Sequence, residues 1–263
     1  MTTEVAIANL NNYHLSMQKS YMDKMFFVDK IDNSTKIVLD FGCADGFLTR
    51  YMAESFPSMI FWGYDKDEQS ITKADSINIL DNCHFTFNLE TFNKWLIDNN
   101  YSKSEVAINL SSVIHEVYSY STEQEIEEFW EYVNSGFKYI IIRDMCMDST
   151  AHRPALKEDL IKFKSRFDNN KITEFEKFHG SIADNYNLIH LLLKHKYEEN
   201  WAREVRENYV PKTAEELATK INNSYKLIYF DHYILPYVAN TIKESFDITI
   251  KDYTHIKFIY KKG

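Results

Sequence analysis

A glycine-rich turn is the part of this sequence whose residue types point most directly to chemistry. Residues 37–39 are apolar and lead into Asp40. Gly42 and Gly46 follow, and residues 47–52 then have the pattern of a helix. Glycine lets the backbone pass close to a bound ligand where a Cβ atom would collide. The order of strand, glycine turn and helix therefore predicts the entry to a nucleotide-binding βαβ unit.

A second signal comes from the next strand candidate, residues 59–64, which ends in Asp65. An acidic residue about 20 positions past a glycine turn suits a carboxylate that accepts hydrogen bonds from two ribose hydroxyls. The glycines do not fit the dinucleotide pattern G-x-G-x-x-G. The pattern D-x-G-x-x-x-G, with Asp65 after it, instead resembles the first two motifs of class I S-adenosylmethionine (SAM)-dependent methyltransferases. The resemblance extends over about residues 37–144 and more loosely to the C-terminus.

The resemblance implies that SAM is bound by the ends of the first four strands. The glycine loop would pass under the methionine part of the cofactor, and Asp65 would hold the ribose, with Lys66 beside the adenine. Asn88 stands where the family often has an acidic residue that binds the adenine amino group. The cofactor-binding residues implied in this way are Asp40, Gly42, Cys43, Ala44, Asp45, Gly46, Asp65, Lys66, Asn88, Leu89, Asn109 and Leu110.

In the resembled family, the loop after strand four faces the reactive methyl group. His115 lies there, and its ordinary pKa suits a general base that removes a proton during methyl transfer. Glu116 is the alternative base, or it orients the histidine. Two other interpretations stay open: His115 has only a packing role, or the reaction proceeds by proximity without a base.

Substrate contacts are predicted on both sides of this loop in the sequence. An aromatic helical face over residues 8–27 is either a lid over the cofactor, as in the resembled family, or a plain packing helix. Arg143 pairs with an acidic neighbour or with an anionic substrate. The candidate substrate residues are Tyr13, Tyr21, Arg143 and His152. The spacing of the histidines predicts no metal site.

Regular alternation of strands and helices from residue 37 to residue 144 predicts a doubly wound, mostly parallel, Rossmann-like α/β sheet. Thr122 and Glu125 form the capping-box pattern of one of its helices. The resemblance implies seven strands, the last antiparallel. The expected strands are residues 37–39, 59–64, 83–87, 105–110, 137–143, 226–230 and 256–260, and the expected helices of the core are residues 67–79, 89–96 and 122–134.

Residues 154–210 show no strand signal, and helical patterns occur at residues 155–167, 183–194 and 199–208. We therefore expect a helical insertion between strand five and the closing strands. Further helices are expected at residues 211–221 and 238–245. The expected division of the chain is an N-terminal helical lid at 1–35, a SAM-binding core at 36–150, a helical substrate-recognition cap at 151–222 and closing strands at 223–263.

Composition limits the location and the partners. The 263 residues have a net charge of −9 and three scattered cysteines. The scattered cysteines, the lack of a signal peptide and the lack of an apolar run of membrane length together predict a cytoplasmic protein. Residues 149–263 hold 19 Lys+Arg and 16 Asp+Glu, a surplus too small to predict a nucleic acid surface. The preferred function is methyl transfer from SAM to a small or medium-sized acceptor. The alternatives are an RNA methyltransferase, such as one acting on tRNA, and a non-catalytic SAM-binding partner subunit, while the oligomeric state stays open.

Overall fold

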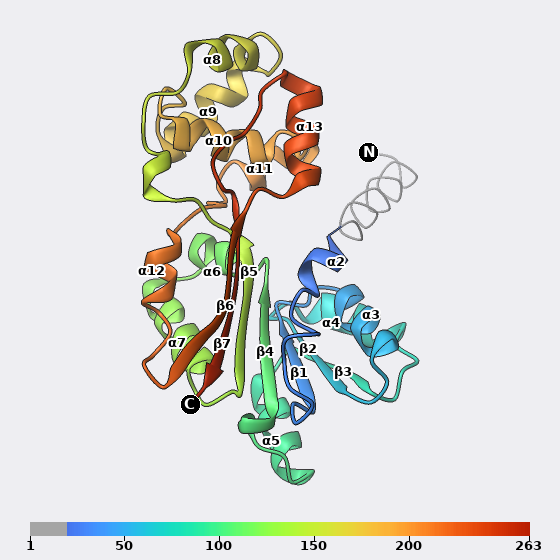
Figure 1. Ribbon diagram of the computed structural model, residues 1–263. Helices are drawn as coiled ribbons and strands as arrows, with labels where there is room; N and C mark the ends of the chain where they lie inside the picture. Colours follow the sequence, from blue (N-terminus) through green and yellow to red (C-terminus); the bar gives the residue numbers. More distant parts are fainter. Residues whose placement is uncertain (1–19) are drawn as a thin grey trace. The chain divides into compact units, whose positions relative to one another are not determined.

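The computed structural model describes residues 20–263, in which seven strands form a sheet in the order β3-β2-β1-β4-β5-β7-β6 (Figure 1). β1 pairs in parallel with β2 and β4, β2 pairs in parallel with β3, and β6 and β7 are antiparallel. This topology confirms the predicted sheet. The strands are β1 (Ile37–Phe41), β2 (Ile60–Tyr64), β3 (Cys83–Thr86), β4 (Val106–Ser111), β5 (Tyr139–Met145), β6 (Tyr225–Tyr233) and β7 (His255–Lys262).

Helices connect the strands. Those of the alternating part are α2 (Tyr21–Lys24), α3 (Phe47–Ser55), α4 (Glu68–Ser76), α5 (Leu89–Asp98), the 3₁₀ turn η1 (Lys103–Glu105), α6 (Ile114–Tyr120) and α7 (Glu123–Val133). After β5 come η2 (Ser149–Ala151), α8 (Lys157–Lys164), α9 (Asn169–His179), α10 (Asn185–Lys194), η3 (Glu198–Asn200), α11 (Trp201–Glu204) and α12 (Ala214–Ala218). The helix α13 (Pro236–Phe246) separates β6 from β7.

The chain forms two compact units. The first ends at Ser111 and also includes Gly136–Ile141, and the second comprises Ser112–Ser135 and Ile142–Gly263. In the first unit every residue of β4 is buried, and so are the first four residues of β1. Apolar runs buried on both faces are expected where helices cover both sides of a parallel sheet.

The helices of the second unit share one buried apolar cluster. Phe163 of α8, Phe175 of α9 and Leu191 of α10 are completely buried in it. Ile242 and Phe246 of α13 belong to the same cluster. The helical insertion therefore completes its core with a helix that follows β6 in sequence, beyond the predicted cap boundary at residue 222. The predicted division into four segments stays a prediction.

Local sequence signals account for several helix ends. Asp67 caps α4 by accepting from the amides of Gln69 and Ser70, and Thr122 and Glu125 form the predicted capping box of α7. The helix α9 was not predicted, and α11 is shorter than the pattern at residues 199–208 suggested. Of the predicted helix at residues 8–27, only the part from residue 20 lies within the described residues. No helix in residues 20–263 combines the length and the apolar character that crossing a membrane requires.

Candidate functional site

The glycine loop of the first unit has a backbone that few side chains tolerate. Gly42 and Gly46 have φ angles of 79° and 73°, and Ala44 has 48°. A Cβ atom on Gly46 would lie 2.3 Å from the ring of Phe85. The amides of Gly42 and Cys43 both donate to the carbonyl of Tyr64 at the end of β2, at 2.7 and 2.9 Å. Glycine is therefore required here by the turn and by the close packing against β3.

Asp65 is held at the carboxyl end of β2 by the backbone on both sides. Its Oδ2 accepts the amide of Ala44 at 2.9 Å, and its Oδ1 accepts the amide of Asp67 at 3.0 Å. The side chain is half-buried. A carboxylate oxygen has more than one acceptor site, so both oxygens keep capacity for hydroxyl donors. The predicted ribose carboxylate is thus fixed in place beside the glycine loop.

Three of the predicted cofactor residues lie in the sheet interior. Asp40 is 3% exposed, and Asn109 and Leu110 are completely buried. Asp40 accepts from the Thr49 hydroxyl at 2.7 Å and from the Asn109 amide at 2.9 Å. Burial raises the pKa of Asp40, and these two hydrogen bonds oppose that effect. The Asp40 carboxylate therefore ties β1 to β4 and α3, and its contact with a cofactor stays a prediction.

The remaining predicted cofactor residues lie at or near helix N-termini. Asn88 caps α5, and its Oδ1 accepts the amide of Glu90 at 2.9 Å. The oxygen that the resemblance assigns to the adenine thus already has one partner. Asp45 pairs with Lys73 at 3.0 Å. Lys66 is exposed and Leu89 is half-buried.

In the second unit, His115 lies in the first turn of α6 and is bound to the end of β5. Asp144 of β5 accepts the amides of Ile114 and His115 through Oδ2, at 2.7 and 3.3 Å. Its Oδ1 lies 2.6 Å from Nδ1 of His115 and also accepts the amide of Met145. The Asp144 side chain is 1% exposed. Asp144 therefore fixes both the start of α6 and the orientation of the imidazole.

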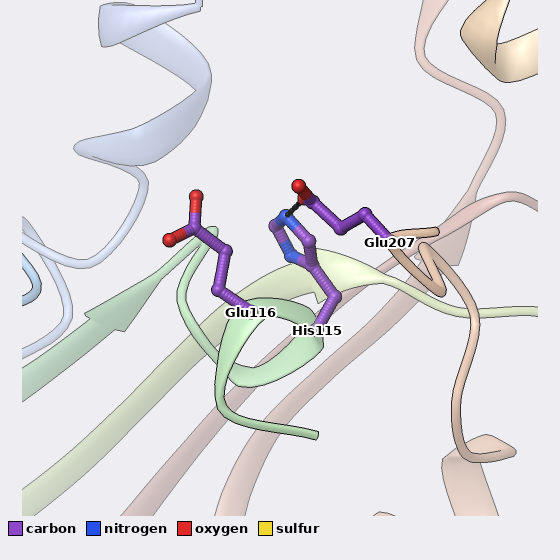
Figure 2. A group of neighbouring side chains, drawn as sticks. All are labelled: His115, Glu116 and Glu207. Atoms are coloured by element: carbon purple, nitrogen blue, oxygen red, sulfur yellow. Dashed lines mark ion pairs between the residues drawn. The ribbon is translucent and has the colours of Figure 1, made fainter. Parts of the chain in front are cut away.

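The other ring nitrogen of His115 meets a carboxylate from the helical insertion. Nε2 lies 3.1 Å from Oε1 of Glu207, which follows α11, as Figure 2 shows. Oε2 of Glu207 accepts the hydroxyl of Tyr120 at 3.0 Å and lies 3.5 Å from Nε of Arg203. Arg203 also donates to Oε1 of Glu116 at 3.1 Å. The imidazole thus stands between two buried carboxylates, and Arg203 joins the outer one to Glu116.

The charges of this cluster depend on one another. Burial alone would lower the pKa of His115, but Asp144 and Glu207 outweigh it and raise the pKa to about 10. Burial opposes ionisation of the two carboxyls, yet the pKa values of Asp144 and Glu207 are both lowered by His115. At neutral pH the cluster is therefore an imidazolium between two carboxylates.

The same group has the composition of a cation site. Single ligand atoms of His115, Glu116 and Glu207 all lie within 4.8 Å of one another. Nitrogen and carboxylate oxygen are ligands that several divalent cations accept. Here Arg203 and the imidazolium already supply positive charge to the carboxylates. The arrangement is therefore described as an ion-pair cluster, and it does not lead us to assign a metal.

The predicted substrate residues are dispersed. Tyr13 lies outside the described residues. Tyr21 is 8% exposed, with its ring centroid 5.5 Å from that of Tyr51. Arg143 is buried and donates to the hydroxyl of Ser112 at 2.9 Å. His152 pairs with Asp184 and stacks on Tyr186. Their contacts with a substrate stay predictions.

Sequence reasoning did not identify three side chains around His115. Glu207, Tyr120 and Tyr209 carry no motif, and Tyr209 packs edge-on against the imidazole with 5.7 Å between ring centroids. Asp144 had a signal, because it is an acidic residue at the end of a buried strand. Glu207 has none, because it is 92 positions from His115 and reaches it only through the fold of the insertion.

No model of a known protein family matches this sequence, and no curated protein matches it either. Among solved structures, it is similar to a SAM-dependent methyltransferase from Anabaena variabilis ATCC 29413, with a TM-score of 0.53 and 11% identity over 94% of this chain and 85% of that one. The plantazolicin methyltransferase BamL, solved with a triazolic desmethylPZN analogue and SAH, has a TM-score of 0.48 and 14% identity over 99% of this chain and 90% of that one. With the strand order, the first likeness shows that this chain has the Rossmann-like fold of class I SAM-dependent methyltransferases.

Proposed function

We propose that this protein binds SAM and transfers its methyl group to a small or medium-sized acceptor that carries a removable proton. The observation that carries the proposal is the pairing of Asp65 with the glycine loop, through the amide of Ala44. A carboxylate held at the end of β2, beside a glycine turn, suits the ribose and the methionine part of the cofactor. The cytoplasmic location stays a prediction.

The proposed reaction is an in-line displacement. A bond forms between the acceptor atom and the methyl carbon, the bond from that carbon to the sulfonium sulfur breaks, and its electron pair stays on sulfur. Holding the three atoms nearly collinear supplies much of the rate. The acceptor loses one proton, for which His115 is the proposed base.

His115 does not act as a base in the state described here, because both ring nitrogens face carboxylates and the ring is charged. The proposal is that the acceptor hydroxyl or amine takes the place of Glu207 Oε1 at Nε2. The departing Glu207 carboxylate takes the Nε2 proton with it, and the neutral Nε2 then accepts the proton of the acceptor. Asp144 keeps the ring oriented throughout.

Calorimetric titration tests the cofactor. We expect micromolar binding of SAM and S-adenosylhomocysteine and no binding of NAD or ATP. Replacement Asp65→Ala removes hydrogen bonds to a charged group, worth about 1.5–3 kcal/mol, and should raise the Kd about 10- to 150-fold. Asp81→Ala, at an exposed position, is the matched control. Equal affinities of both variants for SAM would remove Asp65 from the site.

Turnover with labelled methyl separates the alternatives. Incorporation into small molecules or peptides supports the proposed acceptor class, and incorporation into tRNA alone would replace it with the RNA methyltransferase. Binding of SAM without transfer to any acceptor would favour a non-catalytic SAM-binding subunit.

A further inference from the structure

Lys194, the last residue of α10, has a fully buried side chain. Its Nζ donates to the carbonyl of Glu204 at 2.8 Å and to the carbonyl of Glu207 at 2.6 Å. Nζ also lies 3.4 Å from the ring centroid of Tyr209. These carbonyls belong to the end of α11 and the chain after it, where helical hydrogen bonding stops and acceptors need other partners.

Keeping an ammonium group in this position is costly. Burial lowers the pKa of Lys194 to about 7, against the attraction of Glu204 and Glu207. Within residues 20–263, no carboxylate oxygen lies within 4.0 Å of Nζ of Lys194. An apolar side chain of similar size would avoid the desolvation cost. The hydrogen bonds to the carbonyls of Glu204 and Glu207 are therefore the contacts that offset this cost.

Two histidines hold the same stretch of backbone. Nε2 of His179, in α9, donates to the carbonyl of Val205 at 2.8 Å. Nε2 of His190, in α10, accepts the amide of Tyr209 at 3.2 Å. Three side chains of α9 and α10 thus fix the backbone of residues 204–209, a segment with no regular secondary structure after α11.

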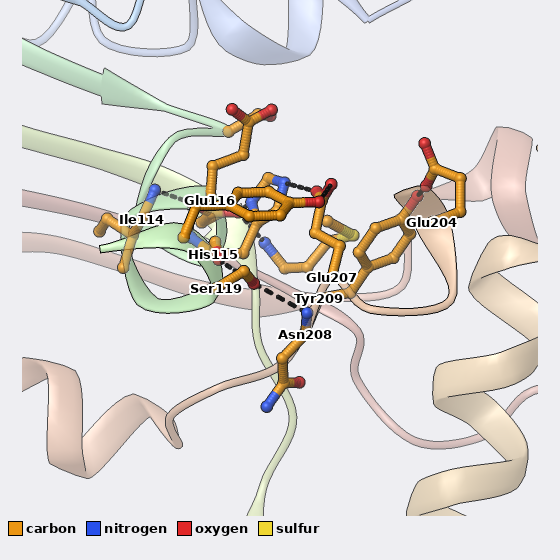
Figure 3. A network of polar contacts seen from close by, with 12 residues as sticks. Ile114, His115, Glu116, Ser119, Glu204, Glu207, Asn208 and Tyr209 are labelled. Atoms are coloured by element: carbon orange, nitrogen blue, oxygen red, sulfur yellow. Dashed lines mark hydrogen bonds and ion pairs between the residues drawn. The ribbon is translucent and has the colours of Figure 1, made fainter. Parts of the chain in front are cut away.

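This segment faces the His115 cluster, as Figure 3 shows. Glu207 contacts Nε2 of His115, and Tyr209 packs edge-on against the same ring. On the side of α6, the amide of Asn208 donates to the hydroxyl of Ser119 at 2.8 Å. Glu207 therefore has a partner at each end. Lys194 donates to its backbone carbonyl, and His115 contacts its carboxylate.

We propose that Lys194 is a positioning residue, which holds the Glu207 backbone so that the Glu207 carboxylate meets His115. This role rests on the proposed function insofar as His115 takes part in methyl transfer. The contact itself is independent of turnover. A residue that only filled space in the insertion would contribute to stability and leave the imidazole of His115 unaffected.

The test is an NMR pH titration of the histidine ring signals, with the His115 signal assigned by its loss in His115→Gln. Glu207→Gln should lower the pKa of His115 by about 1–3, the usual effect of removing a close opposite charge. Lys194→Met should lower it in the same direction, by at least half as much. The double variant should lie no lower than Glu207→Gln alone, because both changes remove one interaction.

Lys196→Met is the matched control, since Lys196 is exposed and its Nζ lies 3.4 Å from the Tyr237 hydroxyl. It should leave the His115 signal unchanged. If Lys194→Met does not fold, Lys194→Gln keeps an N–H donor group and should give a smaller shift in the same direction. An unchanged pKa of His115 in a folded Lys194 variant, whatever its Tm, overturns the proposal. The titration contains neither SAM nor acceptor. Absence of methyl transfer would therefore refute the proposed function and would leave the role of Lys194 unaffected.

Discussion

Because His115 is charged in the folded protein, we expect its contribution to the free energy of unfolding to fall as pH rises. The perturbation is a change from pH 6 to pH 10, applied to the unmodified protein and to His115→Gln. His115 has a pKa of about 10 in the folded protein and about 6.5 when unfolded. Because the folded value is the higher one, the stabilisation is complete below about pH 6.5 and is lost as pH rises through about 10.

The magnitude follows from this difference. The folded and unfolded pKa values of His115 differ by about 3.5. At about 1.36 kcal/mol for each pKa unit, this difference stabilises the folded protein by about 5 kcal/mol when it is fully present. At pH 6 nearly all of it applies, and at pH 10 only a few tenths of a kcal/mol remain. The difference in unfolding free energy between the unmodified protein and His115→Gln should therefore shrink by about 4 kcal/mol over this range.

Urea unfolding followed by circular dichroism at pH 6, 8 and 10 measures both free energies. Since His115 lies in the second compact unit, the transition of that unit is the one to compare. Gln is neutral at every pH used, so the comparison reports the charge of the imidazole together with its pairing to Asp144 and Glu207. A difference that stays constant between pH 6 and pH 10 would refute the claim that Asp144 and Glu207 hold the ring in its charged form.

Three further predictions concern the two sites. In Glu207→Gln, the rising limb of kcat/KM against pH should move to lower pH, because the free enzyme then holds the His115 proton less tightly; an unmoved limb would exclude His115 as the base. Gly46→Ala should destabilise the protein by about 1–3 kcal/mol and weaken SAM binding, because the new Cβ meets the Phe85 ring at a positive φ. Urea unfolding measures the first effect and calorimetry the second, and wild-type values in both would contradict the prediction. Dialysis against EDTA should leave turnover unchanged, since Arg203 and His115 already neutralise the carboxylates; loss of turnover restored by Mg²⁺ or Mn²⁺ would make the cluster a metal site.

The sheet was predictable because its residues carry local signals. The run before Asp40 and the run at residues 105–110 are apolar enough to be buried on both faces of a sheet. They form β1 and β4. α9 lacks such a signal: only Ile172 and Phe175 of its eleven residues are buried, among many polar ones. A helix with so few buried positions gives a weak periodic pattern, although its packing in the insertion is well defined.

The candidate site divides in the same way. Asp65 and Gly46 were assigned to the cofactor site from local spacing, because the turn and the strand end depend on residues close in sequence, and their contact with a cofactor stays a prediction. Asn88 was assigned to the adenine, but the position after β3 is also a helix N-terminus, and its side chain caps α5. Local sequence shows that a polar side chain is needed there and does not tell a cap from a ligand contact.

The His115 cluster changes the role expected of the helical insertion. His115 and Asp144 come from α6 and β5, which belong to the alternating part of the chain, while Glu207 and Arg203 come from the insertion. A segment that only recognised the acceptor would not set the charge of the proposed base. Here the insertion supplies the carboxylate at Nε2 of His115, and the acceptor must displace that carboxylate to be deprotonated. Acceptor binding and activation of His115 are therefore a single step in the proposed mechanism, and an acceptor too small to move Glu207 should bind without being methylated.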